Sequence, residues 1–148
     1  MTTKPLNLLL ADDDMDDCIF FKDALDELPV TAELTTVGDG VQLMKLLAGK
    51  IEMPDALYLD LNMPLKNGFD CLTEIKQDPK LNQLPVIIFS TSFDANVATL
   101  LHEKGAHYYI RKPAEFYNLK RILFKSISLI AGGDNEPISR EKFVLTTP

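Results

Sequence analysis

The chain has 148 residues, 46% of them hydrophobic, which is enough for one domain with an ordinary apolar core. The net charge of −7 and the pI of about 4.7 would repel nucleic acid and anionic membranes, so neither is expected as a partner. No apolar run approaches the roughly 20 residues that span a bilayer, and the N-terminus lacks a secretory pattern. These features predict a cytoplasmic protein.

Short apolar runs and helical stripes alternate along the chain. The runs have the length and content of strands buried in a sheet. The predicted strands are residues 6–11, 33–37, 56–61, 85–89 and 108–111. After each run, apolar residues recur at spacings of three and four, as they do on amphipathic helices. The helical stripes are Cys18, Phe21, Leu25 and Leu28; Val41, Met44 and Leu47; Phe69, Leu72 and Ile75; Val97, Leu100 and Leu101; Phe116, Leu119, Leu123, Ile127 and Ile130.

Five strands that alternate with five helices predict an open parallel sheet with helices on both faces. Right-handed crossovers leave few topologies, and the common five-stranded sheet has the strand order 2-1-3-4-5. The predicted fold is therefore a flavodoxin-like three-layer α/β sandwich within residues 1–131. In this fold the first and third strands are neighbours at the point where such sheets bind ligands beyond their carboxyl ends.

Charged residues stand where three of the predicted strands end. Asp12 and Asp13 follow the first strand, Asp60 lies at the end of the third and Lys112 follows the fifth, while Ser90 follows the fourth. Ionised carboxylates ~4 Å apart repel by ~4 kcal/mol near a protein surface, and a hard cation such as Mg²⁺ relieves that repulsion. A carboxylate beside such a cation can act as a nucleophile and become an aspartyl phosphate. Lysine and serine side chains would then bind the phosphate oxygens.

The same residues carry a family resemblance. The motifs are the acidic pair Asp12-Asp13, Asp60 with Asn62-Met63-Pro64 and Gly68, Ser90, and Lys112-Pro113. In this order they resemble the receiver domain of two-component response regulators, over about residues 6–130. The resemblance implies a phosphoacceptor that takes a phosphoryl group onto Asp60 from a sensor histidine kinase or a phosphotransfer protein. It implies no turnover of an external substrate.

Mg²⁺ is the cofactor that the resemblance implies. In this family likeness, Asp13, Asp60 and the backbone carbonyl of Asn62 would be metal ligands. Asp12 would hold a metal-bound water. The metal site expected from the sequence therefore consists of these four residues.

The resemblance also implies how the phosphoryl group is bound and sensed. Ser90, at a position where threonine is commoner, would be the phosphate-binding hydroxyl, and Lys112 would be the charge partner. Tyr109 matches the aromatic residue that moves together with the hydroxyl residue on activation. The Lys112–Pro113 bond is cis in the family, an isomer that an X-Pro bond adopts at little cost.

Other functions fit the acidic residues less well. Asp14 and Asp17 are interpreted as acids at a helix N-terminus rather than as ligands. A calcium loop would need glycine at Asp17 and glutamate at Asp23. An aspartyl phosphatase would need a general acid at Asn62, and a flavin-nucleotide carrier would need an uncharged phosphate loop at residues 12–14. A receiver-shaped interaction module that no longer takes phosphate would have lost site residues.

Residues 132–148 form a short tail after the last predicted helix. Its glycines and proline indicate a stop and a turn, and the rest is too short for an effector domain. We therefore expect a stand-alone receiver that signals by protein contact. Residues 143–145 are expected to dock on the domain's own surface rather than to form a disordered interaction tail. The fourth helix, fifth strand and fifth helix are the expected surface for an unknown downstream protein, and a homodimer through this face is compatible with the sequence.

Overall fold

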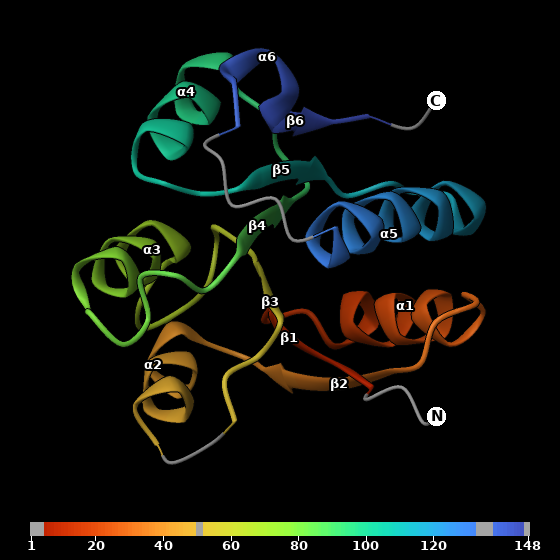
Figure 1. The fold of residues 1–148 in the computed structure, drawn as a ribbon, viewed down its shortest axis with the longest axis horizontal. Coiled ribbons are helices and arrows are strands. Elements are labelled where there is room, and N and C mark those ends of the chain that lie inside the picture. The colour runs from red at the N-terminus through yellow and green to blue at the C-terminus, as the bar shows by residue number, and fades with distance from the viewer. Residues whose placement is uncertain (1–4, 50–51, 133–137, 147–148) are drawn as a thin grey trace.

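The computed structural model describes residues 5–49, 52–132 and 138–146. The strands are β1 (Leu6–Ala11), β2 (Ala32–Val37), β3 (Ala56–Leu59), β4 (Val86–Ser90), β5 (Tyr108–Arg111) and β6 (Val144–Leu145). The helices are α1 (Met15–Asp26), α2 (Gly40–Ala48), α3 (Gly68–Gln77), α4 (Ala95–Glu103), α5 (Phe116–Ala131) and α6 (Arg140–Phe143). The strands form a parallel sheet in the order β2-β1-β3-β4-β5-β6, and helices cover both of its faces (Figure 1).

The flavodoxin-like class and the order of the first five strands are confirmed. β1 and β5 have the predicted bounds, and the other three predicted strands differ from the observed ones by one or two residues at their ends. The described residues contain one strand and one helix more than the five of each expected, because β6 joins the sheet next to β5 and α6 precedes it. Every helix within the described ranges is too short or too polar to cross a membrane.

The sheet separates two hydrophobic cores. Successive side chains of a strand point to opposite faces, so Leu9 and Leu59 pack beneath α2, α3 and α4, whereas Leu10 and Tyr58 pack beneath α1 and α5. Figure 1 shows the two groups of helices on opposite sides of the strands. The central strands are therefore buried on both faces, and this explains why their sequences are apolar without alternation.

The C-terminal segment, residues 138–146, docks along the outer side of β5. Strand β6 pairs with β5 in parallel, and the fully buried Phe143 ring packs near the rings of Tyr109 and His102. Arg140 donates hydrogen bonds to Thr99 Oγ1 at 3.0 Å and to the Ala95 carbonyl at 3.3 Å, both on α4. The prediction that the tail docks on the domain is confirmed, and the docking extends to a strand and a helical turn.

Two expectations about this part of the chain need correction. The C-terminal segment covers the β5 edge and contacts α4, so the expected output face is partly occupied by the chain itself. The described residues contain no cis peptide bond, so the Lys112–Pro113 bond is trans. Because the two isomers of an X-Pro bond differ by only about 0.5–1 kcal/mol, the local surroundings decide between them.

Candidate functional site

Three carboxylates meet at the carboxyl ends of β1 and β3. These strands are paired neighbours, and the Asp60 N–H donates to the Ala11 carbonyl at 3.0 Å. Asp12, Asp13 and Asp60 each contribute one oxygen to a group whose members lie within 4.8 Å of one another. Asp12 and Asp60 are only 2% and 6% exposed, whereas Asp13 is exposed. The sequence prediction that these side chains come together at the switch point of the sheet is confirmed.

Asp12 is the most confined of the three carboxylates. Its Oδ1 accepts a hydrogen bond from the Asp14 N–H at 2.9 Å. Its Oδ2 faces Lys112 Nζ at 2.7 Å in an ion-pair geometry and has no hydrogen-bond donor among the described residues. Burial raises the pKa of Asp12 above its ordinary value, although the Lys112 ammonium and the Asp14 N–H oppose that shift. A cation would therefore find a buried oxygen with spare acceptor capacity here.

Lys112 joins the acidic group from the end of β5. Its Nζ lies 2.7 Å from Asp12 Oδ2, 2.8 Å from Asp17 Oδ2 and 3.1 Å from Asp60 Oδ2. The Lys112 side chain is 9% exposed, and its backbone N–H donates to the Ser90 carbonyl at 2.8 Å. Burial disfavours the ammonium, but the contacts with the aspartates outweigh it, so the pKa of Lys112 lies above its ordinary value. The side chain therefore remains charged at neutral pH.

Asp17 is a site residue that the sequence did not predict. Asp14 is the N-cap of α1, and its Oδ1 accepts from the N–H groups of Asp16 at 2.8 Å and Asp17 at 3.2 Å. Asp14 thus has the expected capping role, whereas the carboxylate of Asp17 reaches across to Lys112. The two partners are 95 residues apart in the chain, so no local spacing could have indicated the contact.

Hydroxyl groups and aromatic rings lie on the other side of Asp60. The fully buried Ser90 Oγ lies 3.3 Å from Ser92 Oγ and accepts the Ser92 N–H at 3.4 Å. The Tyr109 hydroxyl donates to the Ser92 carbonyl, and burial raises the pKa of Tyr109. The Tyr109 ring makes edge contacts with Phe93 and Phe143, at centroid distances of 5.5 and 6.5 Å. A chain of contacts therefore links the end of β4 to the C-terminal segment.

The loop after β3 contacts both the carboxylate and the backbone of Asp60. The Asn62 N–H donates to Asp60 Oδ1 at 3.4 Å, and the Gly68 N–H donates to the Leu61 carbonyl at 3.0 Å. A Cβ atom at Gly68 would lie 2.3 Å from the Asp60 carbonyl oxygen, so only glycine fits this close approach. Asn62 therefore lies next to the carboxylates, as predicted, although its role as a metal ligand stays a prediction.

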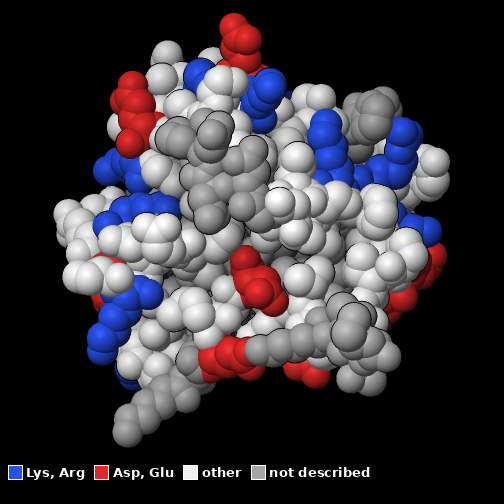
Figure 2. Space-filling view, in the orientation of Figure 1, with Lys and Arg blue, Asp and Glu red and all other residues white. Residues whose placement is uncertain are grey.

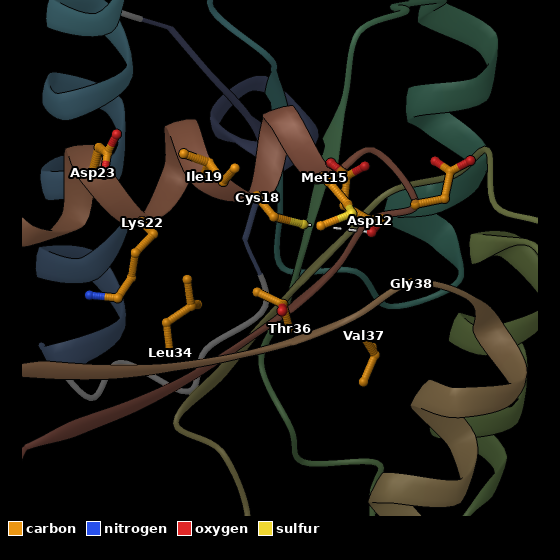
Figure 3. Close-up of a pocket in the computed structure, with 11 residues that line it drawn as sticks. Asp12, Met15, Cys18, Ile19, Lys22, Asp23, Leu34, Thr36, Val37 and Gly38 are labelled. Atoms are coloured by element: carbon orange, nitrogen blue, oxygen red, sulfur yellow. Dashed lines mark hydrogen bonds between the residues drawn. The ribbon is translucent and has the colours of Figure 1, made fainter.

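A groove of about 450 Å³ opens beside the carboxylates, between α1 and β2. Figure 3 shows Met15, Cys18 and Ile19 along α1 on one side of the groove and Leu34 from β2 on the other. Cys18 Sγ lies 3.7 Å from the Asp12 carbonyl, drawn as a dashed line, whereas Met15 is 78% exposed. The approach to the acidic site from the α1 side is thus flanked by apolar side chains.

Buried carboxylates, a charged lysine and a hydroxyl lie along one edge of the parallel sheet, where the sequence predicts binding of a cation and a phosphoryl group. The family model described as the response regulator receiver domain matches residues 8–124, and the chain belongs to this family. Receiver domains are signalling domains of two-component systems, not enzymes that turn over an external substrate.

Relatives and solved structures agree with this family. Response regulator Rcp1 of Synechocystis sp. is 32% identical over 128 residues, which cover 83% of this chain and 84% of that protein. Probable C4-dicarboxylate response regulator DctR of Bacillus subtilis is 34% identical over 125 residues, 84% of this chain and 54% of that protein. The crystal structure of the phosphorylated cyanobacterial phytochrome response regulator RcpA has a TM-score of 0.80 at 30% identity and covers 88% of this chain and 97% of its own. The Mn²⁺-bound form of Rcp1 has a TM-score of 0.72 at 28% identity and covers 91% and 98%.

Proposed function

We propose that the protein is a phosphoacceptor response regulator in which Asp60 receives a phosphoryl group from a histidine kinase or a phosphotransfer protein. The observation that carries this proposal is the position of the Asp60 carboxylate, 3.1 Å from Lys112 Nζ and in one oxygen group with Asp12 and Asp13. A nucleophilic carboxylate needs charge compensation on both its own oxygens and those of the incoming phosphoryl group. The similar protein RcpA has been crystallised in its phosphorylated form.

The carboxylate group fits a divalent cation. Its donors are all oxygen, two of the three side chains are buried, and one Asp12 oxygen has only the Lys112 ammonium opposite it. Asp13, Asp60 and the Asn62 carbonyl would hold Mg²⁺, with Asp12 holding a bound water. When bound, the cation supplies positive charge to the phosphoryl oxygens. The related Rcp1 was crystallised with Mn²⁺, which prefers the same oxygen ligands.

Asp60, Lys112 and Ser90 have different roles in the transfer of the phosphoryl group. An Asp60 carboxylate oxygen forms a bond to phosphorus while the phosphorus–nitrogen bond of the donor phosphohistidine breaks, and the imidazole nitrogen keeps the electron pair. Lys112 exchanges its contact with Asp60 Oδ2 for a phosphoryl oxygen. The Ser90 hydroxyl turns from Ser92 toward another phosphoryl oxygen.

The output is proposed to be protein contact through the surface around α4 and the C-terminal segment. Movement of Ser90 would disturb Ser92 and Tyr109, and Tyr109 contacts Phe143 in that segment. Phosphorylation would shift the population of these side chains only if it binds one arrangement better than the other. A downstream protein or a second copy of the chain would meet the C-terminal segment together with α4 and α5, because β6 covers the β5 edge.

Nucleic acid and membrane surfaces are not among the proposed partners. The net charge is −7. On the described surface of the face in Figure 2, both acidic and basic side chains are present. Such a surface gives little electrostatic attraction for a polyanion.

Intact mass after incubation with acetyl phosphate and Mg²⁺ tests the proposal. We expect one added phosphoryl group, which is absent without Mg²⁺ and absent in Asp60→Asn. Asp55→Asn, the same substitution at the opposite end of β3, serves as the matched control and should still be phosphorylated. If neither acetyl phosphate nor a phosphorylated histidine kinase gives an adduct, and beryllofluoride does not bind, the protein is a phosphate-independent interaction module instead.

A further inference from the structure

Lys112 has one carboxylate partner that stands apart from the other two. Asp12 and Asp60 belong to the oxygen group that fits a cation, and in the described part of the chain that group contains only these two and Asp13. Asp17 projects from α1, contacts Lys112 Nζ at 2.8 Å and is 34% exposed. A cation bound among the carboxylates would therefore compete with the Lys112 ammonium for Asp12 and Asp60, but not for Asp17.

Cation binding creates a conflict at Lys112. Like charges ~4 Å apart repel by roughly 4 kcal/mol near a protein surface, so a divalent cation among the carboxylates would push the ammonium away. Asp12 and Asp60 would at the same time direct their charge toward the cation. Lys112 must nevertheless stay close enough to reach a phosphoryl oxygen on Asp60. It needs a carboxylate that the cation does not take.

We propose that Asp17 is a positioning residue that holds the Lys112 ammonium at the site during phosphoryl transfer. This inference rests on the proposed function. A lysine ammonium has three N–H donors, and Lys112 now donates hydrogen bonds to Asp17 and Asp60 while it forms an ion pair with Asp12. The donor that faces Asp60 turns to a phosphoryl oxygen, and the one that faces Asp17 stays in place.

The position of Asp17 suits this role. It lies in the first turn of α1, whose N-terminus is fixed by the Asp14 cap directly after the site aspartates. A carboxylate there is favoured by the helix dipole whether or not it contacts Lys112. Asp16, in the same turn, shares that benefit but makes no ion pair with a described residue. Asp16 is therefore the matched control, with the same charge, the same helix and no contact with Lys112.

The test compares initial rates of Asp60 phosphorylation by acetyl phosphate at saturating Mg²⁺ in Asp17→Asn and Asp16→Asn. Each substitution removes one negative charge near the site, which by itself should speed the reaction with an anionic donor. If Asp17 positions Lys112, Asp17→Asn should instead react roughly two- to fivefold more slowly than Asp16→Asn, as expected for a partly exposed ion pair. Asp17→Glu keeps a carboxylate within reach of the ammonium and should recover most of the rate.

The outcomes separate this inference from the function on which it rests. If Asp17→Asn reacts as fast as Asp16→Asn or faster, with both variants folded by circular dichroism, Asp17 does not position Lys112. The same conclusion follows if Asp17→Glu is as slow as Asp17→Asn. Wild-type protein and Asp16→Asn that are phosphorylated normally keep the proposed function intact in either case. A wild-type chain that accepts no phosphoryl group overturns both.

Discussion

The two sides of Asp60 are built from different chemistry. On the α1 side, one ammonium meets the carboxylates of Asp12, Asp17 and Asp60, and the site opens into a groove. On the α4 side, hydroxyl groups lead to the Tyr109 ring and then to Phe143, which is fully buried. The α1 side is arranged to respond to a change of charge at Asp60, and the α4 side to respond to a change in side-chain packing.

Under the proposed function, this difference would allow one modification to be both made on Asp60 and reported to the C-terminal segment. Charges respond to a new phosphoryl group over several ångströms without large movement. Packed aromatic rings respond only by exchanging one arrangement for another, because a close-packed interior does not deform continuously. The two responses should therefore be separable by mutation.

Lys112→Ala should have the largest effect, because it removes the ammonium that contacts Asp12, Asp17 and Asp60. Buried carboxylates left without their partner should lower the free energy of unfolding by about 3 kcal/mol, and phosphorylation should slow by roughly 100-fold. Added Mg²⁺ should restore part of the stability by replacing the lost positive charge. Urea unfolding with and without Mg²⁺ measures this.

Lys120→Ala is the control for that substitution. Lys120 Nζ pairs with Glu27 at 3.1 Å, and the two side chains are 28% and 55% exposed, far more than that of Lys112. Loss of such a pair should change the free energy of unfolding by less than about 1 kcal/mol. Equal losses in Lys112→Ala and Lys120→Ala would contradict the view that the site lysine compensates buried charge.

Phe143→Ala should affect the other side alone. The cavity it leaves should lower the free energy of unfolding by up to about 3 kcal/mol, with the C-terminal segment undocking to limit the loss. Hydrogen exchange should accelerate in β6 and along the β5 edge, whereas the rate of Asp60 phosphorylation should change less than about twofold. Phe124→Ala, the same change at an exposed site on α5, should leave exchange unaltered. If Phe143→Ala slowed phosphorylation as much as Lys112→Ala, the α1 side and the α4 side would not be separable by mutation.

His107, just before the amino end of β5, should make a smaller contribution to the pH dependence of the free energy of unfolding. Its Nδ1 accepts the Val86 N–H at 3.3 Å, and burial, with a smaller contribution from Lys76, lowers the pKa of His107 to about 4. Below about pH 6.5 His107 binds a proton in the unfolded chain but stays neutral in the folded chain. The contribution of His107 to the stability of the fold is therefore lost as the pH falls from 6.5 toward 4.

His107→Gln should therefore reduce the loss of stability between pH 7 and pH 5, measured as urea midpoints. Asp12 contributes with the opposite sign, because its raised pKa makes the folded chain the better proton acceptor during acidification. An unchanged pH slope in His107→Gln would mean that the site carboxylates, rather than the histidine, set the acid sensitivity.

Elements with a mostly apolar sequence of their own were predictable, and an element formed only by a tertiary contact was not. β1 and β5 were found with their bounds because most of their residues are apolar and buried, as a strand covered on both faces requires. In α2 the predicted stripe began at Val41, which is exposed, whereas Leu43 is fully buried, since the sheet covers only part of the helix. β6 has two residues and no periodicity, so it becomes a strand only through pairing with β5.

The site was predictable as far as strand order could place it. Asp12 and Asp60 meet because β1 and β3 are neighbours, which the parallel topology dictated in advance. The contact between Asp17 and Lys112 depends on the direction of one helical side chain across the sheet edge, and no spacing encodes that direction. The trans bond at Lys112–Pro113 departs from the family resemblance for a similar reason, because local packing decides between two isomers of nearly equal energy.

Gly68 has a consequence for how freely this sequence can vary. The loop after β3 carries exposed residues such as Leu65 and Asn67, and exposed loops usually drift in sequence. We expect Gly68 not to vary, because a methyl group at this position would clash with the Asp60 carbonyl oxygen. At Gly38, by contrast, an added Cβ would have no atom within 4 Å. In a library of variants selected for retained phosphorylation, position 68 should stay glycine and position 38 should not. The backbone position of Asp60 is thereby kept by a neighbouring residue that carries no side chain.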